Sequence, residues 1–361
     1  MGNARHCNAK LHERVALVAV LFAAWFIPAV QAADSGIPAA KPMAAEIARL
    51  APQSLLIDIA AAGERWVAVG ERGHILLSDD RGASWSQATR VPVQALLTAV
   101  CFFDSQHGLA VGHDETILST SDGGETWSLA HYAPEKQQPL LDVWCGARGH
   151  AIAVGAYSSF YELQEAGAAW SSRSPPLVAA RPAAVKSNDY EDDIPPEYHF
   201  NRIVAASPMR LYIAAEAGHL YRSDDAGASW VELPSPYAGS FFGALPLSNA
   251  EVLVFGLRGH LYRSSDAGVT WQKVETHTDA MLNNGVRFAE NGVAIVGLSG
   301  VVLTSRDGGR SFDLTEQPDR RGISAALAAG SDALAIVGEG GARTLSRLRP
   351  GSNPVARGGQ R

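Results

Sequence analysis

Residues Trp66–Trp85, WVAVGERGHILLSDDRGASW, contain the pattern that decides the fold. The second half, Ser78-x-Asp80-x-Gly82-x-Ser84-Trp85, has the form S/T-x-D-x-G-x-S/T-W/F, which we call an Asp box. A weaker sixth copy, Leu163–Trp170, has Glu165 for the Asp and Ala169 for the second hydroxyl residue. The Asp, Gly and aromatic positions of the five good copies are Asp80, Gly82, Trp85; Asp122, Gly124, Trp127; Asp225, Gly227, Trp230; Asp266, Gly268, Trp271; and Asp307, Gly309, Phe312.

The residue types of an Asp box are those of a turn held together from inside. An Asp carboxylate accepts backbone N–H groups of a turn, a Gly adopts conformations that a Cβ would penalise, and Ser or Thr hydroxyls tie the flanking strands together. The closing aromatic ring is buried under the hairpin. We therefore interpret the boxes as folding devices, because a carboxylate occupied by turn amides is a poor acid or base.

The N-terminal residues have the form of a secretory signal peptide. Arg5, Lys10 and Arg14 precede an apolar run over 15–30, and small residues near Ala32 suit cleavage there. The run is short for a membrane span and contains Pro28, so a retained anchor is the weaker alternative. We expect a signal peptide over 1–32, a flexible lead over 33–43, and an exported, periplasmic or secreted protein without a further membrane span.

The net charge limits the classes of partner, and the cysteine content leaves two redox states open. The net charge is −7, and removal of the signal peptide makes it two units more negative. An acidic chain without a basic run argues against nucleic acid or an anionic membrane as the main partner. Cys101 and Cys145 remain after cleavage, and a disulfide and two buried thiols are both compatible with their places in adjacent repeats.

The boxes belong to a longer repeat. Seven short apolar strands end at residues 70, 112, 155, 215, 256, 297 and 338, a period of 41 to 43 residues interrupted by one spacing of 60. This is the period of a four-stranded propeller blade, and Gly-rich turns between short strands exclude helical solenoids. The sequence therefore predicts an all-β, seven-bladed β-propeller with Asp-box repeats over 44–348.

Three irregular segments accompany the repeats. An insertion over 171–198 follows the third blade. Its prolines and its acidic residues, Asp189, Glu191, Asp192 and Asp193, are typical of an exposed loop. The loop is either a surface insertion without a function or a docking element for a partner. The Gly- and Arg-rich residues 349–361 predict a disordered tail. The last repeat offers only three strands, so we expect Ala44–Leu50 to supply the outer strand of blade seven and close the ring.

The repeat frame V-G-x-x-G-x-[IL]-x-x-[ST]-x-D-x-G-x-x-W resembles that of the photosystem II stability and assembly factor family and its bacterial relatives. It is present at Val69–Trp85 and Val254–Trp271, and the resemblance extends over most of 44–348. Members of that family are lumenal or periplasmic propellers that hold partly assembled membrane complexes without catalysis. The resemblance implies such a role, either in photosynthesis or with another envelope complex.

Asp boxes also occur in sialidases and other glycoside hydrolases, so a glycan-directed hydrolase or lectin is the alternative. Such an enzyme needs an arginine triad or two carboxylates at the channel. The repeat register places Asp58, Thr98, Asp142, Asn201, Ser240, Asn284 and Ser324 on the innermost strands, with Arg202 and Arg287. Asp58 and Asp142 are a possible acid pair, whereas two arginines fall short of a triad.

The remaining histidine pattern does not indicate a metal. His74, His219 and His260 recur at one repeat position, and equivalent positions spread around a ring instead of converging on one ion. We expect no catalytic residue, metal or cofactor, and a monomer whose partner is a membrane-protein complex or another envelope protein. The predicted partner-binding residues are polar at positions that the repeat does not dictate: Asp58, Asp142, Asn201, Arg202, Arg287, Asp189, Glu191, Asp192 and Asp193.

Overall fold

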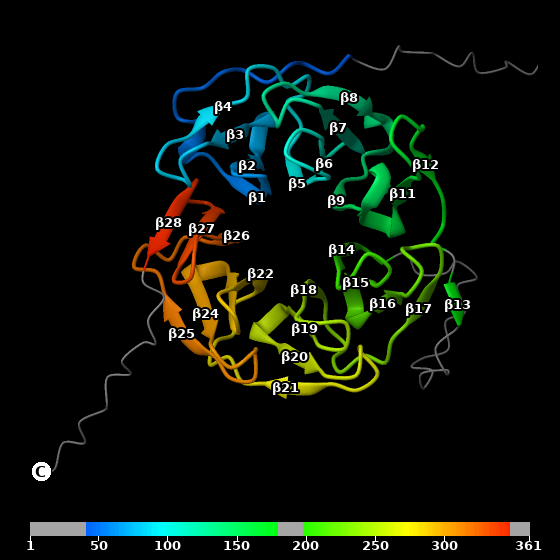
Figure 1. Ribbon diagram of the computed structural model, residues 1–361, viewed down its shortest axis with the longest axis vertical. Helices are drawn as coiled ribbons and strands as arrows, with labels where there is room; N and C mark the ends of the chain where they lie inside the picture. Colours follow the sequence, from blue (N-terminus) through cyan, green and yellow to red (C-terminus); the bar gives the residue numbers. More distant parts are fainter. Residues whose placement is uncertain (1–40, 176, 180–197, 347–361) are drawn as a thin grey trace, which may run out of the picture. The chain divides into compact units, whose positions relative to one another are not determined.

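The computed structural model describes residues 41–175, 177–179 and 198–346, which belong to one compact unit, Lys41–Arg361. Seven sheets follow one another around a ring, and the first strand of each sheet lies at the hub (Figure 1). Each sheet is an antiparallel meander running outward, apart from one added parallel strand. The predicted all-β, seven-bladed propeller is confirmed.

The strands repeat in a fixed order from hub to rim. The hub strands are β1 (Leu56–Ala62), β5 (Leu97–Phe102), β9 (Leu140–Cys145), β14 (Phe200–Ala205), β18 (Phe241–Pro246), β22 (Leu282–Phe288) and β26 (Ile323–Ala328). The second strands are β2 (Arg65–Gly70), β6 (Gly108–Gly112), β10 (Ala151–Gly155), β15 (Leu211–Ala215), β19 (Val252–Gly256), β23 (Gly292–Gly297) and β27 (Ala333–Gly338). The third strands are β3 (Ile75–Ser78), β7 (Thr116–Thr120), β11 (Phe160–Leu163), β16 (Leu220–Ser223), β20 (Leu261–Ser264), β24 (Val301–Ser305) and β28 (Arg343–Ser346).

The outer strands are short, which limits edge pairing with other chains. They are β4 (Ser86–Gln87), β8 (Ser128–His131), β12 (Ser171–Ser172), β17 (Trp230–Glu232), β21 (Gln272–Val274) and β25 (Asp313–Glu316), with β13 (Leu177–Ala179) outside β17. A short 3-10 turn, η1 (Ala51–Gln53), precedes the first strand. Others connect strands: η2 (Glu71–Gly73), η3 (Pro134–Lys136), η4 (Ala147–Gly149), η5 (Ala156–Ser158), η6 (Glu216–Gly218), η7 (Leu257–Gly259) and η8 (Leu298–Gly300).

The core consists of seven apolar clusters, each lying between two neighbouring blades. The second strands are buried along almost their whole length because their two faces contribute to the clusters on either side. A strand covered on both faces reads as a continuous apolar run, which explains why these seven strands were the clearest signal in the sequence.

The five good Asp boxes form the turns that lead out of the third strands, and their predicted hydrogen bonds are present. In the first box, Asp80 accepts the backbone N–H of Ser84 at 2.8 Å and the hydroxyl of Ser78 at 2.9 Å. The Ser78 hydroxyl in turn accepts the N–H of Gly82 at 2.8 Å, and Gly82 has φ +83. Hydrogen bonds from the Ser84 side chain and backbone lower the pKa of Asp80 to about 2.

The predicted closure of the ring by Ala44–Leu50 is wrong. The segment forms no strand; the side chains of Pro42, Ala45 and Ala48 are partly buried at a spacing of three residues, not the spacing of two that a half-buried strand has. It lies along blade one, where Ala45 N–H donates to Val91 O at 2.9 Å and Ala48 N–H to Gln87 Oε1 at 3.0 Å.

Blade seven therefore has three strands within the described residues, and it closes the ring through side chains. Leu56, Trp66 and Leu76 of blade one share an apolar cluster with Ala335 and Val337 of β27. One backbone hydrogen bond, from Ala342 N–H to Pro52 O at 3.0 Å, crosses the same junction.

The insertion begins later than the sequence suggested. Ser171 and Ser172 are the outer strand of blade three, paired with Glu162 and Tyr161 of β11. Residues 177–179 then pair in parallel with β17 of blade four, next to Trp230 and Val231. The other expected segments, the signal peptide, most of the lead, residues 180–197 and the tail, lie outside the described residues.

Candidate partner-binding site at the hub

Two of the predicted acids and one arginine occupy the same place in three hub strands. Each hub strand has an irregular register near its start, so that Asp58 pairs with Val69, Asp142 with Val154 and Arg202 with Ala214. These positions are equivalent around the ring. Since hub strands surround one axis, equivalent positions face each other across it, and the three side chains meet.

Arg202 lies between the two carboxylates. Its Nε is 3.3 Å from Asp142 Oδ2, and its Nη1 is 3.9 Å from Asp58 Oδ1. Asp58 and Asp142 are 4% and 3% exposed, whereas the side chain of Arg202 keeps 25% of its surface accessible. The hub thus contains two buried acids beneath one partly accessible cation.

Both acids also connect neighbouring blades. Asp58 Oδ2 accepts the N–H of Val100 at 3.1 Å, and Asp142 Oδ2 accepts the N–H of Ile203 at 2.7 Å. Asn284, at the equivalent position of blade six, accepts the N–H of Ala326 at 3.3 Å. An acid or amide at this position thus links its blade to the next one, which accounts for the burial of its oxygen atoms.

Burial decides the protonation of the acid pair. It raises the pKa of Asp58, with Arg202 acting in the opposite direction. Burial also raises the pKa of Asp142 to about 6, an effect that Arg202 opposes and the charge of Asp58 reinforces. The pKa of Arg202 is raised despite its burial, because both acids favour its charged form. Arg202 therefore stays positively charged, and above about pH 6 the ionised Asp142 balances that charge within the cluster.

A cavity of about 350 Å³ opens above this cluster at one end of the channel. Its wall is largely apolar, and its polar side chains are partly occupied: Asn201 Nδ2 donates to Phe241 O at 2.8 Å, and Asn283 Nδ2 donates to Ile323 O at 2.8 Å. We call this cavity the hub mouth; it is lined by Leu55, Ile57, Thr98, Leu141, Asn201, Arg202, Phe242, Met281, Asn283, Leu298, Gly322, Ser324 and Glu339. The hub mouth is thus a ring of apolar side chains, called the collar below, around the side chain of Arg202.

The structure brings together four of the predicted site residues and separates a fifth. Asp58, Asp142, Asn201 and Arg202 lie at the hub, whereas Arg287 is exposed near the far end of β22, opposite Val293. Ser240 precedes β18 and is not on a hub strand. The acidic residues Asp189, Glu191, Asp192 and Asp193 lie outside the described residues.

Sequence reasoning missed the apolar part of the mouth. Phe242 and Met281 line it, and nothing in the repeat distinguishes an apolar residue facing the channel from one facing the core. The signal that could have found Phe242 is its position one residue after the first residue of a hub strand, the place that Asn201 and Asn283 hold in other blades.

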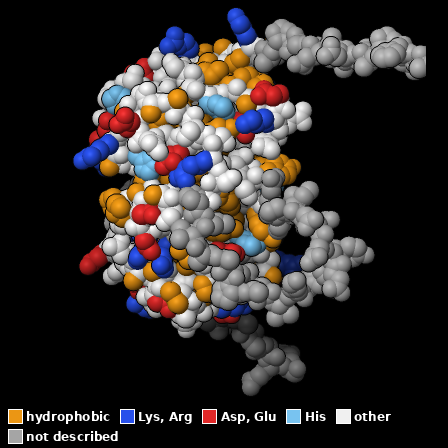
Figure 2. Space-filling view, turned by 90° about the vertical axis from the view of Figure 1, so that its right-hand side faces the viewer, with side chains coloured by type: hydrophobic (Ala, Val, Ile, Leu, Met, Phe, Trp, Pro, Cys, Tyr) orange, Lys and Arg blue, Asp and Glu red, His pale blue; other side chains and the backbone are white. Residues whose placement is uncertain are grey.

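Other sites are absent from the part of the chain that the structure describes. No three or more His, Cys, Asp or Glu side chains there are arranged to hold a metal ion. Within the same residues, no helix has the length and apolar character needed to cross a bilayer. The face seen in Figure 2 carries basic and acidic side chains interspersed, without a broad area of one sign.

The fold and the repeats define the class of protein: a seven-bladed propeller built from Asp-box repeats. Residues 83–139 match the family model described as photosynthesis system II assembly factor YCF48. The predicted resemblance to that family is confirmed over these residues and in the fold. A search of curated proteins gave no significant match.

Solved structures share the architecture at low sequence identity. The structure described as YCF48 bound to D1 peptide is 16% identical, with a TM-score of 0.64, and the alignment covers 86% of this chain and all of that one. YCF48 from Cyanidioschyzon merolae is 15% identical, with a TM-score of 0.62, covering 82% of this chain and 96% of that one. The WD40 propeller domain of Doa1 is 12% identical, with a TM-score of 0.61, covering 85% and 96%. Identities this low establish the fold.

Proposed function

We propose that this protein is a non-catalytic, exported propeller that binds a segment of a membrane-protein subunit at the hub mouth and stabilises the subunit during assembly of its complex. The observation that carries the proposal is the partly accessible Arg202 at the base of an apolar collar. A cavity of this kind accommodates apolar side chains of an extended peptide, while the accessible N–H groups of Arg202 can donate to a backbone carbonyl of the same segment.

Two findings support this proposal. A YCF48 propeller with the same fold has been solved with a D1 peptide, so peptide binding is compatible with this architecture. The acids that a glycoside hydrolase would use, Asp58 and Asp142, are instead engaged by Arg202 and by backbone N–H groups of neighbouring blades. Acids held in this way are poorly placed to act on a glycosidic bond.

Export is a proposal that rests on two features of the chain. The N-terminal basic and apolar residues have signal-peptide character. In addition, Cys101 and Cys145 form a disulfide, a bond that persists in oxidising compartments outside the cytosol.

The test places a photoreactive group in the collar. Phe242 is replaced by a photoreactive phenylalanine analogue, the protein is incubated with detergent-solubilised envelope membranes, and cross-linked peptides are identified by mass spectrometry. The same analogue at Met209, which is 54% exposed on the hairpin between β14 and β15, is the matched control. We expect one membrane-protein segment to be enriched at position 242 and absent at 209.

A pair of charge-introducing variants tests whether the collar is the binding surface. Met281→Glu places a charge in the hub mouth, and Met209→Glu places the same charge on the exposed hairpin. Loss of the cross-linked partner with Met281→Glu, but not with Met209→Glu, is the expected result. Equal capture by both variants, or cross-links at 242 to no membrane protein, would contradict the proposal.

A further inference from the structure

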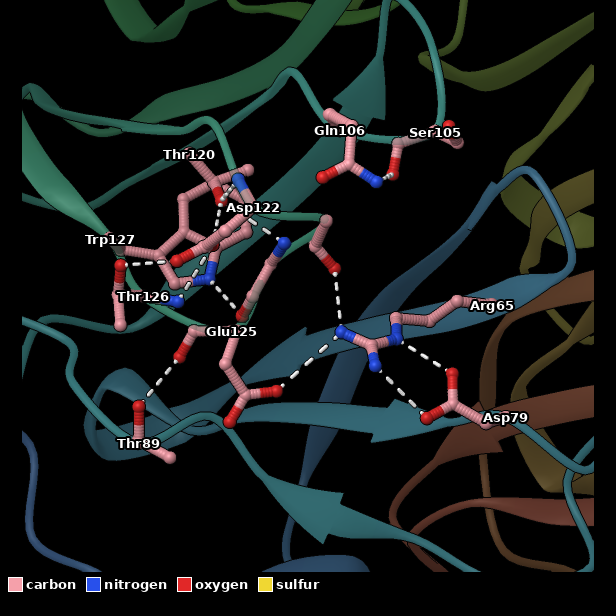
Figure 3. Close-up of polar contacts among 12 residues, drawn as sticks. Arg65, Asp79, Thr89, Ser105, Gln106, Thr120, Asp122, Glu125, Thr126 and Trp127 are labelled. Carbon is pink, nitrogen blue, oxygen red and sulfur yellow. Dashed lines mark hydrogen bonds and ion pairs between the residues drawn. The ribbon is translucent and has the colours of Figure 1, made fainter.

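Arginines join neighbouring blades at the Asp boxes. Between blades one and two, Arg65 Nη1 donates to Gly123 O, inside the second box, at 3.3 Å and also pairs with Asp79 and Glu125 (Figure 3). Three further junctions repeat this link from the preceding blade to the following box: Arg173 to Gly227 O at 3.0 Å, Arg222 to Ala267 O at 2.8 Å and Arg263 to Gly308 O at 3.4 Å.

The box glycines provide a second connection, because each approaches the preceding blade closely. A Cβ at Gly124 would lie 3.3 Å from Leu77 of blade one, and a Cβ at Gly309 would lie 2.9 Å from Leu253 of blade five. Gly227 and Gly268 approach Ile152 and Leu233 in the same way, and Gly82 approaches Thr344 of blade seven. An arginine link together with a packed glycine is called here a box lock.

The junction between blades two and three has no box lock within the described residues. Gly167, the glycine of the degenerate sixth box, has no atom within 4 Å of the position a Cβ would take. Arg222 and Arg263 directly precede the first hydroxyl residue of their boxes, and the residue at that position in blade two is Ser119, which is too short to cross the junction. Instead, a groove of about 520 Å³ lies here, lined in part by Leu109, Ser119, Leu163 and Gly167.

The disulfide of the protein crosses this same junction. Cys101 lies on β5 of blade two and Cys145 on β9 of blade three, with Cα atoms 5.8 Å apart. Both half-buried cysteines pack against the apolar cluster that contains Leu109 and Leu163, two residues of the groove wall. The covalent bond thus lies at a junction without a box lock. Blade seven has no Asp box, and within the described residues its two junctions also lack a complete box lock, so the disulfide distinguishes the junction between blades two and three.

Other contacts hold the two blades together elsewhere along the junction. Tyr161 donates its hydroxyl to the buried Glu115 at 2.6 Å, and Lys136 pairs with the same carboxylate at 2.8 Å. Thr98 donates to Leu140 O at 2.7 Å near the hub mouth. These contacts involve the turn between β6 and β7 and the early part of the hub strands, whereas the disulfide lies at the late end of β5 and β9.

We propose that the junction between blades two and three is a redox-sensitive joint, in which the Cys101–Cys145 disulfide replaces the absent box lock. A dithiol supplies two electrons and two protons, the Sγ–Sγ bond breaks to leave two thiols, and the dithiol becomes its own cyclic disulfide. Reduction then loosens the late ends of β5 and β9 around the groove. The contacts of Glu115, Tyr161 and Lys136 keep the other end of the junction closed.

Hydrogen exchange of the oxidised and dithiothreitol-treated full chain tests the joint. The hairpins 102–108 and 145–151 should exchange on the order of tenfold faster after reduction, while the corresponding hairpins of blades five and six stay protected. The melting temperature should fall by on the order of 5 °C. An unchanged exchange pattern, or acceleration spread evenly over all blades, would overturn the proposal.

Two variants separate the joint from general destabilisation. Cys101→Ser with Cys145→Ser should show the reduced exchange pattern and no response to dithiothreitol. Restoring the lock in this background, with Ser119→Arg, Leu163→Ser, Glu165→Asp and Ala169→Ser, should return protection to both hairpins. If the restored variant folds but both hairpins stay unprotected, the disulfide does not replace the box lock. If the variant does not fold, the comparison of the wild-type protein before and after reduction tests the proposal.

Discussion

Arg202 of blade four reaches Asp142 of blade three, with its Nε 3.3 Å from Asp142 Oδ2. The same guanidinium lies 3.9 Å from Asp58 of blade one, so a single arginine compensates two buried acids from different blades. A buried carboxylate left without its cation is costly, typically by 3–5 kcal/mol. The hub cluster is therefore a stability determinant as well as the base of the proposed binding site.

Replacing Arg202 by Met should lower the free energy of unfolding by about 3–5 kcal/mol near pH 7.5, because both acids then lose their cation. Urea denaturation measures the change. Arg287→Met is the control, since Arg287 is exposed at the other end of its hub strand, and its cost should stay within about 0.5 kcal/mol. Similar losses for the two variants would argue against a compensated hub.

The pH dependence of stability should reveal Asp142. Its pKa is raised to about 6, from an unfolded value of 3.8, so the folded state binds this proton more tightly than the unfolded state. The resulting stabilisation is complete below about pH 4 and is lost as the pH rises through 6. Between pH 4 and pH 7, the unfolding free energy of wild type should therefore fall relative to Asp142→Asn by on the order of 2–3 kcal/mol. Parallel pH profiles for the two proteins would disprove this assignment.

An intact Asp box should be far more sensitive than the degenerate one. Asp225→Ala removes hydrogen bonds from the Ser223 hydroxyl and from the N–H and hydroxyl of Ser229, and should cost about 2 kcal/mol. Glu165→Ala, at the same position of the sixth box, should be nearly neutral. Chemical denaturation of both variants provides the comparison, and equal costs would mean that the hydrogen bonds of the box contribute little.

Two glycines with the same unusual backbone separate strain from packing. Gly227 has φ +93 and Gly167 has φ +83, so Ala at either position pays a conformational cost of about 1 kcal/mol. At Gly227 the new methyl group would also collide with Ile152, whereas at Gly167 it meets open space. We expect Gly227→Ala to cost at least about 2 kcal/mol more than Gly167→Ala in thermal unfolding. A difference near zero would show that the junction between blades three and four accommodates the new methyl group at little cost.

The N-terminal segment should act on blade one, because Gln87 holds it through Ala48 N–H and Glu46 O. Gln87→Ala should speed hydrogen exchange in 44–50 and around Val91, and leave β28 of blade seven unchanged. The control is Gln272→Ala on the outer strand of blade five, where the side chain is exposed. Faster exchange in β28 upon Gln87→Ala would revive the closure of blade seven by this segment.

Local pattern predicted the blades well, and long-range contacts account for what it missed. The second strands are recognisable because burial on both faces makes each one a continuous apolar run, and the Asp boxes because their hydrogen bonds join residues close in sequence. The hub cluster is only partly recognisable from the sequence: the repeat aligns Asn201 with Asp58, whereas the strand pairing makes Arg202 the equivalent residue, because Asp58 lies 12 residues before the end of its second strand and Arg202 lies 13 before the end of its own.

The closure of the ring and the pairing of the cysteines depend on distances that spacing in sequence does not give. The missing strand of blade seven favours placing Ala44–Leu50 there, yet Gln87 and Val91 of blade one hold the segment. Cys101 and Cys145 were compatible with a disulfide or two thiols, and only the approach of β5 to β9 decides for the disulfide.

Closure by interlocking side chains between blade seven and blade one has a consequence for the order of the gene. In the described residues, no N-terminal strand completes the C-terminal blade, and blades seven and one meet through side chains. The fold of the ring therefore does not require the chain to begin and end at this junction. A circular permutant opened at another exposed connection between blades, with the old ends joined by a linker, should assemble the same seven sheets. The chain ends could then lie at a different connection between blades in a related protein, while the residues of the hub keep the same arrangement.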